Sequence, residues 1–210
     1  MLINVAMTLD GKIDTIERRG AAISSERDRE RVDHLRASVD AVMVGGRTLH
    51  AEDPRLNVRS AELRAGRVAR GEPEQPAKVA ITSRFALPQA SRFLTAGPAR
   101  VIIFGDVGPV VGAEVYGTSD LRDVMDKLRE LGMRRILVEG GGTLNFALLQ
   151  AGLVDEVQLY LSPLIFGGSS APTLADGAGL TRDLAVQLQP PEIDAWPNGG
   201  IVLRYMVKRS

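Results

Sequence analysis

The chain has 210 residues, enough for one domain with a substantial hydrophobic core. Its 26 basic and 26 acidic side chains balance, which argues against nucleic acid or an anionic membrane as a partner. No cysteine is present, which excludes disulfides, thiolate zinc sites and cysteine nucleophiles. The only histidines, His34 and His50, are too few for a histidine-rich metal site, and no metal is expected.

The N-terminal residues lack the basic start and long apolar core of a signal peptide, and no apolar run is long enough to span a membrane. We therefore expect a soluble, cytoplasmic protein. No break in composition divides the sequence, so we expect residues 1–210 to form a single domain.

Short apolar segments alternate with helical patterns along most of the chain, which predicts a mixed, largely parallel α/β sheet. The charges of the helix that follows Ser24 are expected to form a solvated face, and residues 61–77 an Arg-rich helix and an exposed, mobile excursion. Two late strands predict an antiparallel edge. Strands are expected over 2–8, 40–44, 78–82, 100–104, 114–116, 136–138, 154–161, 184–189 and 200–207, and further helices over 120–131 and 143–151.

One stretch, residues 134–146, carries the strongest indication of a ligand. Three glycines, Gly140, Gly141 and Gly142, follow a buried strand, and Thr143 and Leu144 open a helical pattern. Backbone without Cβ atoms lets a ligand approach closely, and the N–H groups of a first helical turn favour a phosphate. Glycines at such a turn also serve close packing alone, and both interpretations stay open.

Further strand ends carry groups of the same kind. Gly45 and Gly46 end the strand over 40–44, Gly105 ends the strand over 100–104, and ligands bind at the carboxyl ends of strands in open α/β sheets. Ser83 and Arg84 follow the strand over 78–82, where a hydroxyl and a guanidinium suit the 2′-phosphate of NADPH.

A Pro-containing loop over 53–59 places an acid and two arginines within seven residues. The planar guanidinium of arginine donates paired hydrogen bonds to a phosphate monoester. An ordinary surface loop with ion pairs is the alternative for this segment taken alone. A glycine-rich loop over 166–179 either closes over a ligand or only connects its neighbours.

Several separated segments together resemble the pyrimidine reductases of riboflavin biosynthesis, which have a dihydrofolate-reductase-like fold. The resemblance runs in the same order along nearly the whole chain. It is carried by Ala6-Met-Thr-Leu-Asp-Gly-Lys12, Val44-Gly-Gly-Arg-Thr48, Asp53-Pro-Arg-Leu-Asn-Val-Arg59, Val138-Glu-Gly-Gly-Gly-Thr-Leu144, Leu153-Val-Asp-Glu156 and Pro163.

The resemblance implies a three-layer sandwich and NADPH-dependent reduction of 2,5-diamino-6-ribosylamino-4(3H)-pyrimidinone 5′-phosphate, or of its deaminated uracil analogue, to the ribitylamino product. In this chemistry the N-riboside opens to a Schiff base, which accepts hydride at the sugar C1′. Because the chain begins directly at the reductase and has no cysteine for a zinc deaminase, we expect a stand-alone reductase that acts before deamination. The family also implies a homodimer.

The resemblance assigns roles residue by residue. Arg59 would bind the substrate 5′-phosphate, Asp53 and Leu56 would shape the same pocket, and Asp10 lies on a neighbouring strand end with Lys12. Glu139 would contact the substrate near the reacting centre, and either Glu139 or Lys12 would act as the general acid. NADPH would be held by Gly45, Gly46, Thr48, Gly105, Gly140, Gly141, Gly142, Thr143 and Leu144, with Ser83 and Arg84 at its 2′-phosphate.

Two other functions remain open at this stage. A dihydropterin reductase would keep the fold and the hydride but change the acceptor, although a phosphate anchor at Arg59 suits a sugar phosphate better. A non-catalytic nucleotide-binding protein would keep the glycine turns, and the presence of both Glu139 and Arg59 argues against it. The choice between NADPH and NADH also stays open.

Overall fold

The computed structural model describes residues 1–208, and the chain groups into two compact units. Unit 1 comprises Met1–Asp28 and Val138–Ser210, and unit 2 comprises Arg29–Leu137. The division falls within helix α1 (Glu26–Ala37) and strand β6 (Ile136–Val138). No helix in the described part of the chain is both long and apolar enough to cross a membrane.

The core of unit 2 contains four parallel strands, each of which pairs with the next in chain order. The first three are buried along almost their full length and are apolar except for Lys78 on the second of them, as expected for strands covered on both faces. These strands confirm the predicted parallel sheet, with bounds shifted by about one residue. They are β2 (Ala41–Gly45), β3 (Ala77–Ile81), β4 (Val101–Phe104) and β5 (Glu114–Tyr116).

Unit 2 also contains four helices, of which α5 (Leu121–Glu130) follows the predicted signals most closely. The Asp120 carboxylate accepts the N–H groups of Arg122 and Asp123, and Gly132 ends the helix at φ 82°. The other three are α2 (Gly46–Glu52), α3 (Ala61–Ala69) and α4 (Arg92–Thr95), and the sequence did not predict α2 or α4.

The expectation that α1 turns all its charges to solvent is wrong for two acids. In unit 1, the fully buried Asp28 accepts a hydrogen bond from the Ser24 hydroxyl at 2.5 Å. In unit 2, the two carboxylate oxygens of the buried Asp33 each accept a backbone N–H at 2.7 Å, from Arg59 and Ser60. A buried carboxylate needs hydrogen-bond partners of this kind. Asp28 and Asp33 therefore hold neighbouring segments in place and do not contribute to the solvated face.

The expectation of an exposed excursion over residues 61–77 is wrong for its central arginine. The Arg67 side chain is buried, and its guanidinium donates to the carbonyl groups of Ala37, Val39 and Pro73. Burial lowers the pKa of Arg67 from its ordinary value. The arginine therefore anchors this segment to the unit instead of facing water.

Lys78 on β3 is fully buried and holds the carboxyl end of α4. Its ammonium donates to the carbonyl oxygens of Phe93 at 3.0 Å and Ala96 at 2.6 Å. Burial lowers the pKa of Lys78 from 10.5 to about 8, while Asp53 opposes this shift. The group is therefore charged at neutral pH and loses its proton in the folded state before it would in the unfolded state.

This difference predicts a specific dependence of stability on pH. Between pH 8 and 10.5 the unfolded chain keeps the Lys78 proton that the folded chain has released, so the free energy of unfolding rises with pH there. The lowering of the Lys78 pKa from 10.5 to about 8 corresponds to a rise of at most about 3 kcal/mol in the free energy of unfolding. The carbonyl acceptors favour the charged ammonium and so limit this pKa shift. Chemical unfolding across this window should show the rise in the native protein and not in Lys78→Met; equal pH dependence in both would contradict the assignment.

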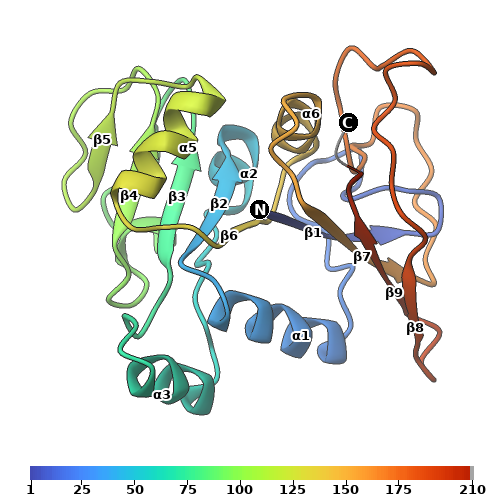
Figure 1. The fold of residues 1–210 in the computed structure, drawn as a ribbon, viewed down its shortest axis with the longest axis horizontal. Helices are drawn as coiled ribbons and strands as arrows, with labels where there is room; N and C mark the ends of the chain where they lie inside the picture. The colour runs from blue at the N-terminus through green and yellow to red at the C-terminus, as the bar shows by residue number, and fades with distance from the viewer. Residues whose placement is uncertain (209–210) are drawn as a thin grey trace. The chain divides into compact units, whose positions relative to one another are not determined.

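In unit 1, strands β1, β7, β9 and β8 lie side by side in that order (Figure 1). Strands β1 (Leu2–Thr8) and β7 (Glu156–Ser162) are parallel, whereas β9 (Ile201–Met206) pairs antiparallel with both β7 and β8 (Glu192–Ala195). The predicted antiparallel edge is thus confirmed. Helix α6 (Gly142–Gln150) also belongs to this unit.

The prediction of a strand over 184–189 is wrong, because the strand that forms the edge is β8, at Glu192–Ala195. Leu188 makes only an isolated bridge to Val207. Pro190 and Pro191 follow, and proline cannot donate to a strand ladder, so regular pairing starts after them. The chain then turns back at Trp196, whose N–H donates to the Gly200 carbonyl at 2.8 Å.

Candidate functional site

In unit 1, the first turn of α6 follows the glycines after β6 and has the features of an anion site. Its N-cap is Gly141, no side chain in residues 1–208 caps it, and its first turn contains no acid. The first N–H groups of a helix lack partners within the helix, and the helix dipole favours negative charge there. Thr143 is exposed at this end, whereas Leu144 is buried in the core.

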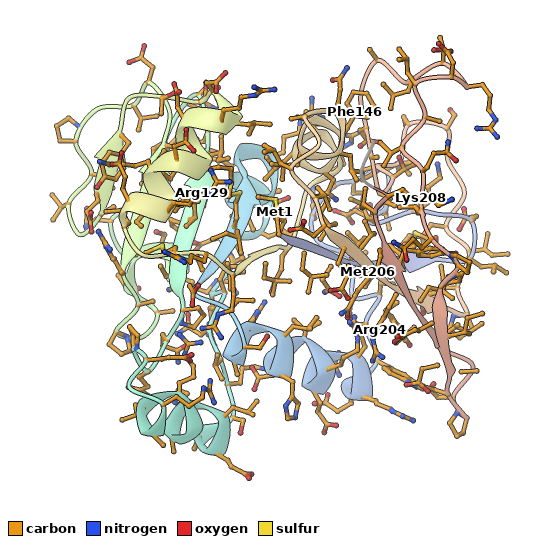
Figure 2. All side chains as sticks on the ribbon, in the orientation of Figure 1. Met1, Arg129, Phe146, Arg204, Met206 and Lys208 are labelled. Atoms are coloured by element: carbon orange, nitrogen blue, oxygen red, sulfur yellow. The ribbon has the colours of Figure 1, made fainter. Side chains whose placement is uncertain are left out.

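Gly142 is needed for packing, whatever else it does. A Cβ atom at this position would lie 2.5 Å from the Thr173 carbonyl oxygen and 2.8 Å from Oδ2 of Asp176. Phe146, labelled in Figure 2, lies on the same helix, and a Cβ atom at Gly177 would be 2.1 Å from its ring. The glycine-rich loop over 166–179 therefore packs closely against α6, and the packing interpretation of Gly142 holds.

Asp10 and Lys12 at the end of β1 are both tied to this loop. The Asp10 carboxylate accepts the Thr8 hydroxyl at 2.6 Å and the N–H groups of Phe166 and Gly167 at 3.2 and 2.7 Å. These hydrogen bonds, led by that of Thr8, lower the pKa of Asp10. Lys12 forms an antiparallel bridge with Thr173. Thr173 thus contacts Lys12 on one side and approaches Gly142 on the other.

Glu139 directly follows β6 and is half-buried in unit 1. It precedes Gly140, which has φ 114°, a conformation that favours glycine. The Gly140–Gly141 peptide bond is cis. Glu139 therefore lies three residues before the start of α6, on the segment that joins the strand to the helix.

In unit 2, three strand ends meet around Thr82, a residue that the sequence did not single out. A Cβ atom at Gly46 would lie 2.5 Å from the Thr82 hydroxyl oxygen, and one at Gly105 would lie 1.7 Å from the Thr82 carbonyl oxygen. Gly45 is the N-cap of α2, and Thr48 is half-buried on the same helix. The glycines at these strand ends thus let the backbones of neighbouring segments approach each other.

Ser83 and Arg84 are exposed in a turn that two further side chains hold. The Thr82 hydroxyl contacts both the carbonyl and the N–H of Arg84. On α2, Nδ1 of His50 is 2.6 Å from the Gly46 carbonyl oxygen, and its Nε2 accepts the Ala86 N–H at 3.2 Å. This pattern requires the neutral ring with its proton on Nδ1. The turn presents a hydroxyl and a guanidinium to solvent.

The two ends of the loop over 53–59 contact different helices. The Asp53 carboxylate accepts the N–H groups of Arg92 and Phe93 at 2.8 and 2.9 Å, and so caps α4. Asp53 and Leu56 have positive φ angles of 41° and 53°, and Leu56 is buried. Arg59 is half-exposed and turns toward α1, where it donates to the Arg29 carbonyl at 2.8 Å. Asp53 and Leu56 therefore shape the loop, and Arg59 is one of its two exposed arginines, the other being Arg55.

The structure thus groups the predicted residues within each unit. In unit 1 the loop over 166–176 links Asp10, Lys12 and Gly142, and in unit 2 Thr82 links Gly46 and Gly105. Thr82, His50, Thr173 and Asp176 were missed. For Thr173 and Asp176, the one available indication was their Thr-x-x-Asp spacing after Gly167 and Gly168. Threonine and aspartate side chains at such a spacing form hydrogen bonds with nearby backbone N–H groups.

Comparison with known proteins identifies the family of the chain. The family described as the RibD C-terminal domain matches residues 1–202. The 2,5-diamino-6-ribosylamino-4(3H)-pyrimidinone 5′-phosphate reductase of Archaeoglobus fulgidus is 37% identical over 198 residues, covering 89% of this chain and 90% of the relative. The reductase of the same name from Methanothermobacter thermautotrophicus is 38% identical, covering 86% and 85%.

A solved structure, form 1 of Acinetobacter baumannii RibD, superposes with a TM-score of 0.83 at 25% identity and covers 99% of this chain and 58% of its own. The predicted dihydrofolate-reductase-like α/β fold is thereby confirmed. Fold and relatives define an oxidoreductase of the kind that serves riboflavin biosynthesis. The chain belongs to the RibD C-terminal domain family.

Proposed function

We propose that this chain reduces 2,5-diamino-6-ribosylamino-4(3H)-pyrimidinone 5′-phosphate to the ribitylamino product with NADPH. The observation that carries the proposal is the 37% identity to the Archaeoglobus fulgidus reductase of that substrate across about nine-tenths of both chains. The half-exposed guanidinium of Arg59 suits a substrate phosphate. The stand-alone, single-domain organisation over residues 1–210 stays a prediction.

The donor groups at the strand ends fit a phosphorylated nicotinamide cofactor. The uncapped first turn of α6 suits its pyrophosphate, and the exposed Ser83 and Arg84 suit a 2′-phosphate. The other candidates for cofactor contacts are Gly45, Gly46, Thr48 and Gly105 in unit 2, and Gly140 to Leu144 in unit 1. The bound cofactor supplies hydride, and the protein has to orient it and neutralise its charge.

The other assigned residues would act on the substrate. Arg59 would hold the 5′-phosphate, with Asp53 and Leu56 fixing the loop that carries it. Lys12 or Glu139 would donate a proton to the ring oxygen as the sugar opens, so that C1′ becomes an imine carbon able to accept hydride. In the described chain, Asp10 would act indirectly, because its carboxylate already binds the loop at 166–167.

An anaerobic assay that follows NADPH absorbance tests the proposal. Oxidation should be fastest with NADPH and the diamino-ribosylamino-pyrimidinone phosphate, and slower when the deaminated analogue replaces this substrate or NADH replaces NADPH. Faster reaction with the deaminated analogue would place the enzyme after deamination instead. Oxidation only with a dihydropterin, by a folded protein that binds NADPH, would replace the proposed substrate.

The proposal includes a homodimer in the cytoplasm. Exposed apolar side chains, Ile193 on the edge strand β8 and Met206 on the adjacent strand β9, support a partner subunit. The lack of cysteine fits a reducing compartment.

A further inference from the structure

The segment from Thr173 to Asp176 in unit 1 is a turn held by a single carboxylate oxygen. Oδ1 of Asp176 accepts the Thr173 hydroxyl at 2.7 Å and the Thr173 N–H at 3.1 Å. Both residues are half-buried. A carboxylate that receives two short bonds from one residue fixes both its backbone and its side chain.

One side of this turn is fastened to the first turn of α6. The Asp176 N–H donates to the Gly142 carbonyl at 3.0 Å, and the amide nitrogen of the buried Asn145 donates to the Leu174 carbonyl at 2.8 Å. The absence of a side chain at Gly142 permits this approach, because a Cβ atom there would collide with the turn. The turn is therefore packed against the helix end assigned to the cofactor.

The other side of the turn is fastened to the segment that follows β1. Lys12 bridges Thr173, and the Ile13 N–H donates to the Pro172 carbonyl at 3.0 Å. Lys12 itself returns to β1, since the Thr8 N–H donates to its carbonyl at 2.9 Å. The turn thus lies between Lys12 and the amino end of α6, and it contacts both.

We propose that Asp176 is a positioning residue that fixes the spacing between Lys12 and the first turn of α6. The inference rests on the proposed function, in which Lys12 is near the reacting sugar and α6 holds the cofactor. In this role Asp176 acts through Thr173, whose geometry it sets and against which both segments rest. Hydride transfer requires the two reactants within a few tenths of an ångström of their productive separation, so a loosened turn lowers the rate of the chemical step.

Three variants test this role. Asp176→Ala removes the acceptor, whereas Asp176→Asn keeps an Oδ1 that can accept both bonds from Thr173. Asp183→Ala is the matched control, because Asp183 also binds a nearby threonine, Thr181, and that hydrogen bond lowers its pKa. Asp183 lies in an exposed part of the same C-terminal region, and none of its contacts given by the structure reaches α6 or Lys12.

We expect Asp176→Ala to lower kcat by roughly tenfold or more, with the Kd of NADPH changed by less than about threefold. Asp176→Asn and Asp183→Ala should stay within about threefold of the native kcat. A merely destabilising role would leave kcat unchanged well below the unfolding temperature. Native kcat in Asp176→Ala, or equal losses in the alanine and asparagine variants, would overturn the proposal.

Hydrogen exchange gives a measurement that does not depend on the substrate. The Ile13 amide should exchange roughly tenfold faster in Asp176→Ala and at the native rate in Asp176→Asn. Unchanged exchange in both variants would show that Asp176 does not hold the Lys12 segment. If instead the native protein oxidises NADPH with neither pyrimidine while Ile13 responds as expected, the proposed function fails and the turn still acts as described.

Discussion

Gly105→Ala is expected to lower the free energy of unfolding by at least about 3 kcal/mol. The new Cβ atom would lie 1.7 Å from the Thr82 carbonyl oxygen, which belongs to the backbone and cannot rotate away. Gly105 also has φ 144°, a conformation that side chains with a Cβ atom rarely adopt. Relief would require β3 and β4 to separate at their carboxyl ends, where the Thr82 N–H donates to the Phe104 carbonyl at 2.9 Å.

Chemical unfolding of Gly105→Ala beside Gly108→Ala measures this effect. Gly108 lies three residues further along the chain, and a Cβ atom there would meet no atom within 4 Å. Its substitution should change stability by less than about 0.5 kcal/mol. Comparable stability of the two variants would show that Thr82 and Gly105 do not pack as the structure has them.

Arg59→Ala is expected to raise the KM for the phosphorylated substrate roughly 100-fold, because charged hydrogen bonds to a phosphate are worth about 2 to 3 kcal/mol. Folding should be little affected. The Arg59 side chain is half-exposed and its Nε is 3.8 Å from Oδ1 of Asp33, which is too far for a hydrogen bond, so this pair contributes little. Asp33 holds the loop through the backbone N–H of Arg59, which the substitution keeps.

The same substrate without its phosphate separates binding from disruption. If Arg59 recognises the phosphate, Arg59→Ala and the native protein should reduce the 5′-hydroxyl compound with similar kcat/KM. An equal loss with both substrates would mean that the variant disturbs the loop, and Arg59 would not be the phosphate anchor. Arg59→Lys should recover only part of the affinity, since an ammonium cannot donate the paired bonds of a guanidinium.

Local patterns in the sequence were sufficient for most of the regular elements. The buried strands of unit 2 are short, mostly apolar runs, and α5 carries both its Asp120 cap and the glycine that ends it. Such signals act within a few residues and survive in any tertiary context. The edge strand β8 was missed because Glu192–Ala195 has little apolar character and its pairing with β9 is decided at long range.

Roles of single charged and glycine residues were the weaker predictions. Asp53 caps α4, Asp33 holds the Arg59 loop, and Arg67 is buried, whereas the sequence predicted a pocket-shaping role for Asp53 and solvent-facing charges for the other two. The hydrogen-bond partners of Asp33 and Asp53 are backbone N–H groups 26 to 40 residues away along the chain. No periodicity or spacing rule operates over such a separation, so the sequence does not show these contacts.

By itself, the sequence of this protein determined the α/β class, the order of most strands and helices, and the family resemblance, because these depend on local periodicity and contiguous motifs. Only the tertiary structure decided why particular residues stand at the strand ends. Gly46 and Gly105 make room for Thr82, Gly142 makes room for the turn of Asp176, and that turn joins α6 to Lys12. Steric exclusion and hydrogen-bond satisfaction between distant segments exist only once the chain has folded.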